Sequence, residues 1–156
     1  MVLALIEKVV DDLNTYLTAN MAAKLTALNT EYSDGITLVD IKTYYIAEVQ
    51  AIPEYPSIFL LGDNVEVLSE GGSWLKSGNN LDIIVFVGDP NTTTLRRRIY
   101  RYIRALIELL VAARTSQGWA VNFKGVELSP MYSKGGDYLS DAHLSIQIVA
   151  TETHAL

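Results

Sequence analysis

Residues 81–114, LDIIVFVGDPNTTTLRRRIYRYIRALIELLVAAR, join a strand pattern to a helix pattern and set the architecture of the chain. Residues 81–87 are almost all apolar and lack polar alternation, which predicts a strand covered on both faces. The Gly-Asp-Pro-Asn sequence at 88–91 interrupts that strand, and the threonines that follow it can cap a helix. From Leu95 to about Arg114, apolar residues recur at three- and four-residue steps, which predicts a long amphipathic helix.

The sequence on either side of this unit predicts a further helix and several strands. Residues 2–28 repeat apolar residues at helical spacing and are followed by a turn-rich stop at 29–35. The other predicted strands, rich in β-branched, aromatic or alternating residues, cover 41–50, 57–61, 65–69, 119–128 and 142–151. This order predicts one α+β domain over residues 1–156, with a mixed, mostly antiparallel sheet and both helices packed on one of its faces.

Glycine-containing turn signals separate the predicted strands. They fall at 62–64, 71–72, 78–80 and 135–137. The stretches 55–62 and 129–138 are accordingly predicted as long loops, and loops of that length are usually functional or mobile. We expect them to serve in an assembly contact.

The composition excludes several classes of protein. The 156 residues include no cysteine, which rules out a disulfide scaffold, a thiolate metal site and a cysteine nucleophile. Hydrophobic residues make up 49% and charged residues 19%, a balance opposite to that of disordered chains. The net charge of −6 argues against general affinity for duplex nucleic acid, because such binding depends on neutralising phosphates. Acidic residues interrupt the apolar N-terminus, so neither a signal peptide nor a membrane span is predicted.

Catalytic and metal-binding signatures are weak. No phosphate-binding glycine loop or nucleophile elbow occurs, and His143 stands alone in a predicted strand, where a histidine is more often structural. Asp40-Ile41-Lys42, preceded by Asp34, matches the acid-x-lysine pattern of metal-dependent nucleases, but this tripeptide is common by chance. Asp137 and Asp141 lie near glycines and are candidates for weak binding of a hard cation, although a solvated hairpin loop is the simpler interpretation. We therefore predict no catalytic residue, no metal site and no cofactor.

The arginines are confined to one segment. All six lie between Arg96 and Arg114, so residues 95–114 carry a net charge of +5 whereas residues 1–94 carry −9. One interpretation is a solvated helix face whose long side chains cover neighbouring apolar surface. The other is a contact stripe for an acidic surface on a second copy of the chain or on another protein. A nucleic-acid stripe is less favoured because the rest of the chain would repel phosphate.

Tyrosine is the second type of candidate interface residue. The nine tyrosines are spread over the predicted strands, loops and helices. A tyrosine combines an apolar ring with a polar hydroxyl, which suits interfaces as well as the wet edge of a core. Together the two patterns give the predicted subunit or partner interface, which consists of Arg96, Arg97, Arg98, Arg101, Arg104, Tyr55, Tyr132 and Tyr138.

The order of the predicted elements resembles that of a known protein family. A leading helix is followed by a strand with Tyr55-Pro56 at its edge, by the strong strand that ends at Asp89, by the helix rich in arginine and tyrosine, and by a final alternating strand. This arrangement resembles the tail terminator, or tail completion, proteins of long-tailed bacteriophages, which include minor tail proteins that cap the tail tube. The resemblance covers most of the chain and is most specific at residues 81–112.

This resemblance implies a structural virion protein and not an enzyme. It implies a small α+β subunit that forms a ring, commonly a hexamer, on the last ring of tail tube protein, ends tail polymerisation and presents a surface to the head connector. It further implies synthesis in the host cytoplasm, a place in the virion where head and tail join, passage of DNA through the ring without specific binding, and no membrane contact. Head-closure and other neck proteins share the size and acidic balance. A non-catalytic cellular adaptor domain and a small metal-dependent nuclease are two further interpretations of the sequence.

The uneven charge distribution suits a ring. Each subunit of a head-to-tail ring must offer two different surfaces. The +5 helix and the −9 N-terminal portion are candidates for those surfaces. Charge reversal at Arg97, Arg101 and Arg104 is then expected to weaken the ring.

Overall fold

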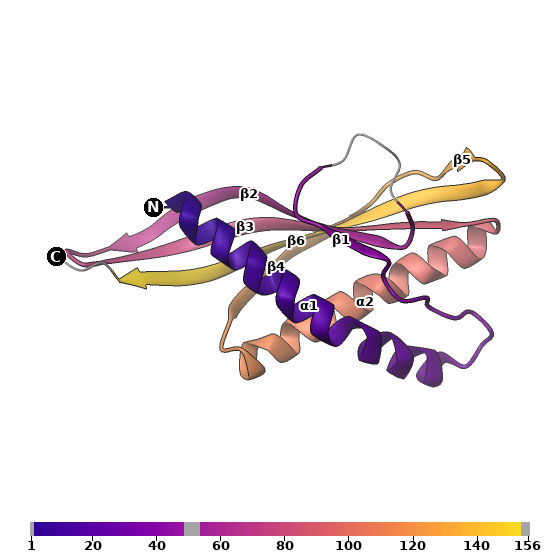
Figure 1. The fold of residues 1–156 in the computed structure, drawn as a ribbon, viewed down its shortest axis with the longest axis horizontal. Helices are drawn as coiled ribbons and strands as arrows, with labels where there is room; N and C mark the ends of the chain where they lie inside the picture. Colours follow the sequence, from indigo (N-terminus) through magenta and orange to yellow (C-terminus); the bar gives the residue numbers. More distant parts are fainter. Residues whose placement is uncertain (1, 49–53, 154–156) are drawn as a thin grey trace.

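The computed structural model describes residues 2–48 and 54–153, and within them two helices pack on one face of a mixed, mostly antiparallel sheet (Figure 1). The α+β class and the placement of both helices are as predicted from the sequence. No helix in these residues is long and apolar enough to cross a membrane. In chain order the elements are α1 (Val2–Tyr32), β1 (Thr43–Tyr45), β2 (Ser57–Glu70), β3 (Trp74–Asp89), α2 (Thr92–Ser116), β4 (Ala120–Leu128), β5 (Tyr132–Lys134) and β6 (Asp137–Thr153).

The sheet is built around two long antiparallel strands. Its order is β1-β2-β3-β6-β4, with β5 paired separately to β6. β3 pairs with β6 along its whole length, from Trp74 opposite Thr153 to Asp89 opposite Tyr138. The short β1 pairs in parallel with the start of β2, and every other pair of strands is antiparallel.

The core lies between the helices and one face of the sheet. Alternate residues of the strands point to the same face, so apolar residues at every second position form a continuous surface for the helices. The helices contribute apolar side chains at three- and four-residue spacing. Buried members of this core include Leu13, Leu17, Met21, Leu25, Ile58, Leu60, Ile83, Val85, Ile99, Leu106, Leu144 and Ile146.

Side-chain and backbone features mark the end of α1 and both ends of α2. α1 continues through Tyr32, beyond its predicted end, and the amide of Asn29 bonds both backbone groups of Leu38 at 2.7 and 3.0 Å. α2 is capped by Asn91, whose side chain accepts from the Thr94 N–H at 2.9 Å, and not by one of the threonines. Gly118 follows the end of α2 at a φ of 69°, a left-handed conformation that glycine adopts readily.

The sequence prediction divided two long strands wrongly. The Gly-Asp-Asn sequence at 62–64 was predicted as a turn, but the structure places a register shift there and β2 continues to Glu70. Likewise, residues 78–80 lie inside β3, which starts at Trp74. A bulge accommodates an extra residue without ending the strand, and glycine is common at such positions.

Two smaller predictions also need correction. The strand predicted at 41–50 is formed only at β1, and its residues 49–50 lie outside the described part. The strand predicted at 57–61 is present as the start of β2, so the stretch 55–62, which was also predicted as a loop, is mostly strand. The predicted loop at 129–138 contains the hairpin of β5 and β6. Its turn uses Gly135 and Gly136, both at positive φ.

The end of the β2–β3 hairpin extends beyond the helices. We define the arm as residues 65–76, whose turn contains Gly71 and Gly72. From Gly62 to Glu70, no residue of β2 is buried, whereas its first residues lie in the core. Figure 1 shows the arm projecting past the start of α1, at the opposite end of the molecule from β5 and the start of α2.

Candidate assembly surfaces

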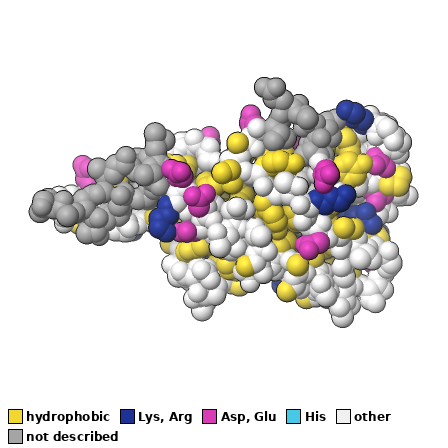
Figure 2. Space-filling model, in the orientation of Figure 1, with side chains coloured by type: hydrophobic (Ala, Val, Ile, Leu, Met, Phe, Trp, Pro, Cys, Tyr) yellow, Lys and Arg dark blue, Asp and Glu magenta, His cyan; other side chains and the backbone are white. Residues whose placement is uncertain are grey.

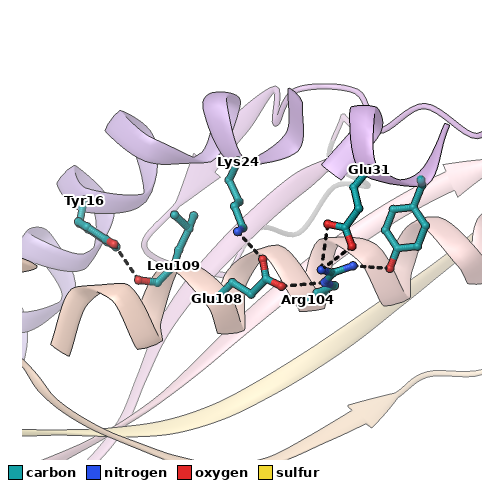
Figure 3. A network of polar contacts seen from close by, with 7 residues as sticks. Tyr16, Lys24, Glu31, Arg104, Glu108 and Leu109 are labelled. Atoms are coloured by element: carbon teal, nitrogen blue, oxygen red, sulfur yellow. Dashed lines mark hydrogen bonds and ion pairs between the residues drawn. The ribbon is translucent and has the colours of Figure 1, made fainter. Parts of the chain in front are cut away.

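Ion pairs and hydrogen bonds join α1 to α2 along their exposed seam (Figure 3). Arg104 of α2 donates to Glu31 of α1 at 2.9 Å and to Glu108 of its own helix at 2.7 Å. Lys24 of α1 pairs with the same Glu108, and these two cations hold the pKa of the Glu108 carboxyl below its usual value. Tyr16 donates to a backbone carbonyl of α2 at 2.7 Å. Arg104 therefore serves to hold the helices together.

Arg101 ties α2 to the loop after α1. Its guanidinium donates twice to the Asp34 carboxylate, once at 3.0 Å, and to the Ile36 carbonyl at 3.0 Å. It also lies over the ring of Tyr32, 3.8 Å from the centroid. The hydrogen bond from Arg101 is the main cause that lowers the pKa of Asp34 to about 2. Only 5% of Arg101 is exposed.

The arginines near the start of α2 bond the sheet and its connections. Arg98 pairs with Asp89 at the end of β3, at 2.7 Å. Arg96 reaches the carbonyl of Ser129, after β4, at 3.4 Å. Arg97 is exposed, and among residues 2–48 and 54–153 no carboxylate pairs with it.

The predicted exposed arginine stripe is therefore wrong in part. Arg101 is buried, and Arg98 and Arg104 pair within the chain. Among the described residues neither Arg96 nor Arg97 pairs with a carboxylate, and of these two Arg97 is the exposed one, since Arg96 is half-buried and donates to the Ser129 carbonyl. Two of these arginines have partners far away in the sequence: Asp34 is 67 positions from Arg101, and Glu31 is 73 positions from Arg104. A helical pattern alone carries no signal for such a pairing.

The predicted interface tyrosines occupy two different environments. Tyr132 and Tyr138 are exposed and lie on the β5–β6 hairpin. Tyr55 is half-buried; its hydroxyl donates to the Asp137 carboxylate and its ring packs edge-on against Phe86, with centroids 6.2 Å apart. These two contacts hold Tyr55 against β3 and β6, whereas Tyr132 and Tyr138 are available for contacts with another chain.

The candidate nuclease and cation residues do not come together. Asp34 pairs with Arg101, and the Asp40 carboxylate accepts from the Ile41 N–H at 3.0 Å. Asp141 bonds Ser129 and lies 3.2 Å from His143. Within the described ranges, no group of three or more His, Cys, Asp or Glu side chains is placed to hold a metal ion.

A groove lies between the first turns of α1 and the middle of β2. It has a volume of about 530 Å³, and its apolar side chains include Ile6, Val10 and Val65. Glu7 and Asp11 of α1 and Asp63 of β2 also line it. Figure 2 shows acidic side chains, a basic one and hydrophobic ones together on the surface over this half of α1. We call this feature the acidic groove; the sequence pattern indicated only the acidic balance of the N-terminal portion.

The arm carries the second surface that the sequence did not indicate. Val67 and Leu68 are 54% and 45% exposed, and Trp74 is also exposed. A strand pair that projects from the helical layer and presents apolar side chains to water is typical of a protein that forms contacts with another chain. The sequence signals for this hairpin were the strand predicted at 65–69 and the turn glycines beside Trp74, and neither indicated that the hairpin projects beyond the helices.

Comparison with known proteins gives no family for the chain. No protein-family model matches the sequence, and no curated protein matches it. The fold and surfaces define an α+β protein with unlike features at its two ends. The arm and the start of α1, which lines the acidic groove, lie towards one end, and the start of α2 and the β5–β6 hairpin lie at the other (Figure 1). Arg97 is on α2, and the exposed Tyr132 and Tyr138 are on the hairpin.

Proposed function

We propose that the chain is a tail terminator, the ring-forming subunit that caps the tail tube of a long-tailed bacteriophage. The observation that carries this proposal is the contrast between the two ends of the molecule. One end offers the arm and the acidic groove. The other offers Arg97 and two exposed tyrosines, Tyr132 and Tyr138. A subunit whose two ends differ in charge and shape is suited to head-to-tail association, and such contacts form a ring when the rotation between neighbouring subunits closes.

The chemistry of these surfaces supports the proposed role. The chain has 18 acidic against 12 basic residues, and several of the arginines are paired within the subunit, so the subunit as a whole repels phosphate. DNA would therefore pass through such a ring without being held. The ring, commonly a hexamer in the family that the sequence resembles, would contact tail tube protein on one face and the head connector on the other, at the junction of head and tail in the virion.

Sedimentation velocity over a wide concentration range tests the proposal. A ring-forming subunit is expected to pass from monomer to one closed species of fixed mass, because closure satisfies both surfaces of every copy. A continuous ladder of growing species would instead indicate an open filament. A monomer at every concentration would favour a non-catalytic adaptor domain and would contradict the ring.

A further inference from the structure

We propose that the acidic groove of one subunit binds the exposed ridge of α2 in the next copy of the chain, with Arg97 and Tyr100 at the centre of the contact. This inference rests on the proposed ring and names the surfaces that form it. It differs from the stripe expected from sequence, since most of that stripe is used within the subunit.

The acidic groove combines apolar walls with acidic side chains, so it suits a side chain that carries a positive charge on an apolar stem. Ile6, Val10 and Val65 provide apolar walls. Glu7 and Asp11 lie one helical turn apart, and like charges at this spacing repel each other. The neighbouring Lys8 does not neutralise them, because it pairs with Asp12 at 2.6 Å. Within the described ranges no cation pairs with the groove acids, so an incoming cation would relieve the repulsion.

The ridge, which consists of Arg97 and Tyr100 on α2, presents a positive charge beside an aromatic ring. Arg97 and Tyr100 are three positions apart on α2, so their side chains are neighbours on one face of the helix. Tyr100 is 53% exposed, and Arg97 is exposed with no acid partner among the described residues. Arginine and tyrosine are the residue types that most often dominate binding energy at interfaces, because each combines apolar area with directed hydrogen bonding.

The positions of groove and ridge make the contact head to tail. The groove lies at the start of α1 and the ridge near the start of α2, at opposite ends of the molecule (Figure 1). One subunit therefore cannot satisfy its own groove. A symmetric contact of groove on groove would place acids against acids, which costs free energy. Charge complementarity thus favours the ridge of another copy as the occupant.

A charge swap tests the contact. The ridge variant is Arg97→Glu, and the groove variant is Asp11→Lys with Asp63→Lys. Each variant alone places like charges across the contact and is expected to raise the dissociation constant of self-association at least about tenfold. An equal mixture of the two, or one chain carrying all three changes, restores opposite charges and should recover the assembly of the parent. Lys42→Glu, another reversal of an exposed cation, is the matched control and should assemble like the parent.

The variants are chosen to fold. Lysine at position 11 stands four residues after Glu7 and creates a favourable pair on the helix surface. Glutamate at position 97 lies near the N-terminal half of α2, where a negative charge does not oppose the helix dipole. Thermal melts check that each variant retains the parent's unfolding transition.

The outcomes separate this inference from the proposed function. If the parent forms rings and the variants form them with the same dissociation constant, the groove–ridge contact is overturned while the ring stands. If the single variants lose assembly and the mixture does not regain it, the pairing of these two surfaces is also overturned. If the parent never self-associates, both the ring and the contact are overturned.

Discussion

Arg101 illustrates, at the scale of single residues, how a charge that looks exposed in sequence becomes part of the interior. Its position on α2 predicted a solvent-facing side chain, yet Asp34, Ile36 and Tyr32 surround the guanidinium. A buried arginine is tolerated when its donors are satisfied and a carboxylate balances its charge. The segment that supplies these partners turns back after α1, and nothing in the helical pattern of α2 specifies where that segment lies.

The Asp34 carboxyl provides a test at low pH. Folding lowers its pKa to about 2, below the value of about 3.9 in an unfolded chain. Its stabilising contribution is therefore fully present above about pH 4 and is lost as the pH falls towards about 2. We expect Asp34→Asn to lower the thermal midpoint at neutral pH, and the difference from the parent to shrink over that acidic range in thermal melts.

Asp40→Asn is the control for this experiment. Among residues 2–48 and 54–153 the Asp40 carboxylate accepts a hydrogen bond only from the Ile41 backbone N–H, and its side chain is exposed. We expect this variant to follow the pH dependence of the parent. A difference between Asp34→Asn and the parent that stays constant through the acidic range would contradict the ion pair with Arg101.

At the scale of elements, α1 is attached to the sheet mainly by its buried leucines. Leu17 has no exposed surface and lies in the core cluster. We expect Leu17→Ala to lower the free energy of unfolding by about 2–5 kcal/mol, since it removes buried methyl groups and leaves a cavity. Urea unfolding measures this value. Thr15→Ala, an exposed change on the same helix, should stay within about 0.5 kcal/mol of the parent; equal effects of the two would contradict the placement of α1.

Elements that are specified by the residues within their own segment were predicted correctly from the sequence. The continuation of a strand that depends on pairing with another strand was not. The two helices follow from helical periodicity and the apolar part of β3 from a continuous apolar run, and all three were predicted at nearly their observed positions. The extension of β2 past Gly62 was missed because the same residues serve in a turn or a bulge, and only pairing with β3 decides between them.

The arm makes a prediction about assembly without a change in stability. Val67 and Leu68 are exposed, so replacing both with threonine should change the free energy of unfolding by less than about 0.5 kcal/mol. If the arm contacts a neighbouring copy in the proposed ring, the same variant should self-associate more weakly, because it removes apolar surface from that contact. Sedimentation velocity together with thermal melts checks both parts. Trp74 is retained because its indole lies against Gly71 in the hairpin turn.

Val39→Thr is the control for the arm variant, since Val39 is as exposed as the arm residues but lies in the loop after α1. It should leave self-association unchanged. Loss of assembly in Val39→Thr, or parental assembly in the arm variant, would contradict a role for the arm.

At the scale of the whole molecule, the separation of charge is the feature that sequence and structure share. The segment totals of +5 and −9 indicated unlike surfaces, but not which residues present them. Arg98, Arg101 and Arg104 of the basic segment form ion pairs within the chain, whereas Arg97 is exposed. Three acids of the acidic portion, Glu7, Asp11 and Asp63, line one groove because α1 packs beside β2, a contact between segments far apart in sequence.

Closure of this chain into a ring is tested most directly by negative-stain imaging of the purified protein at high concentration, with mass measurement in parallel. We expect rings with a central hole and a single subunit number given by the mass. A compact monomer at every concentration, with no ring in any image, would contradict the proposed function.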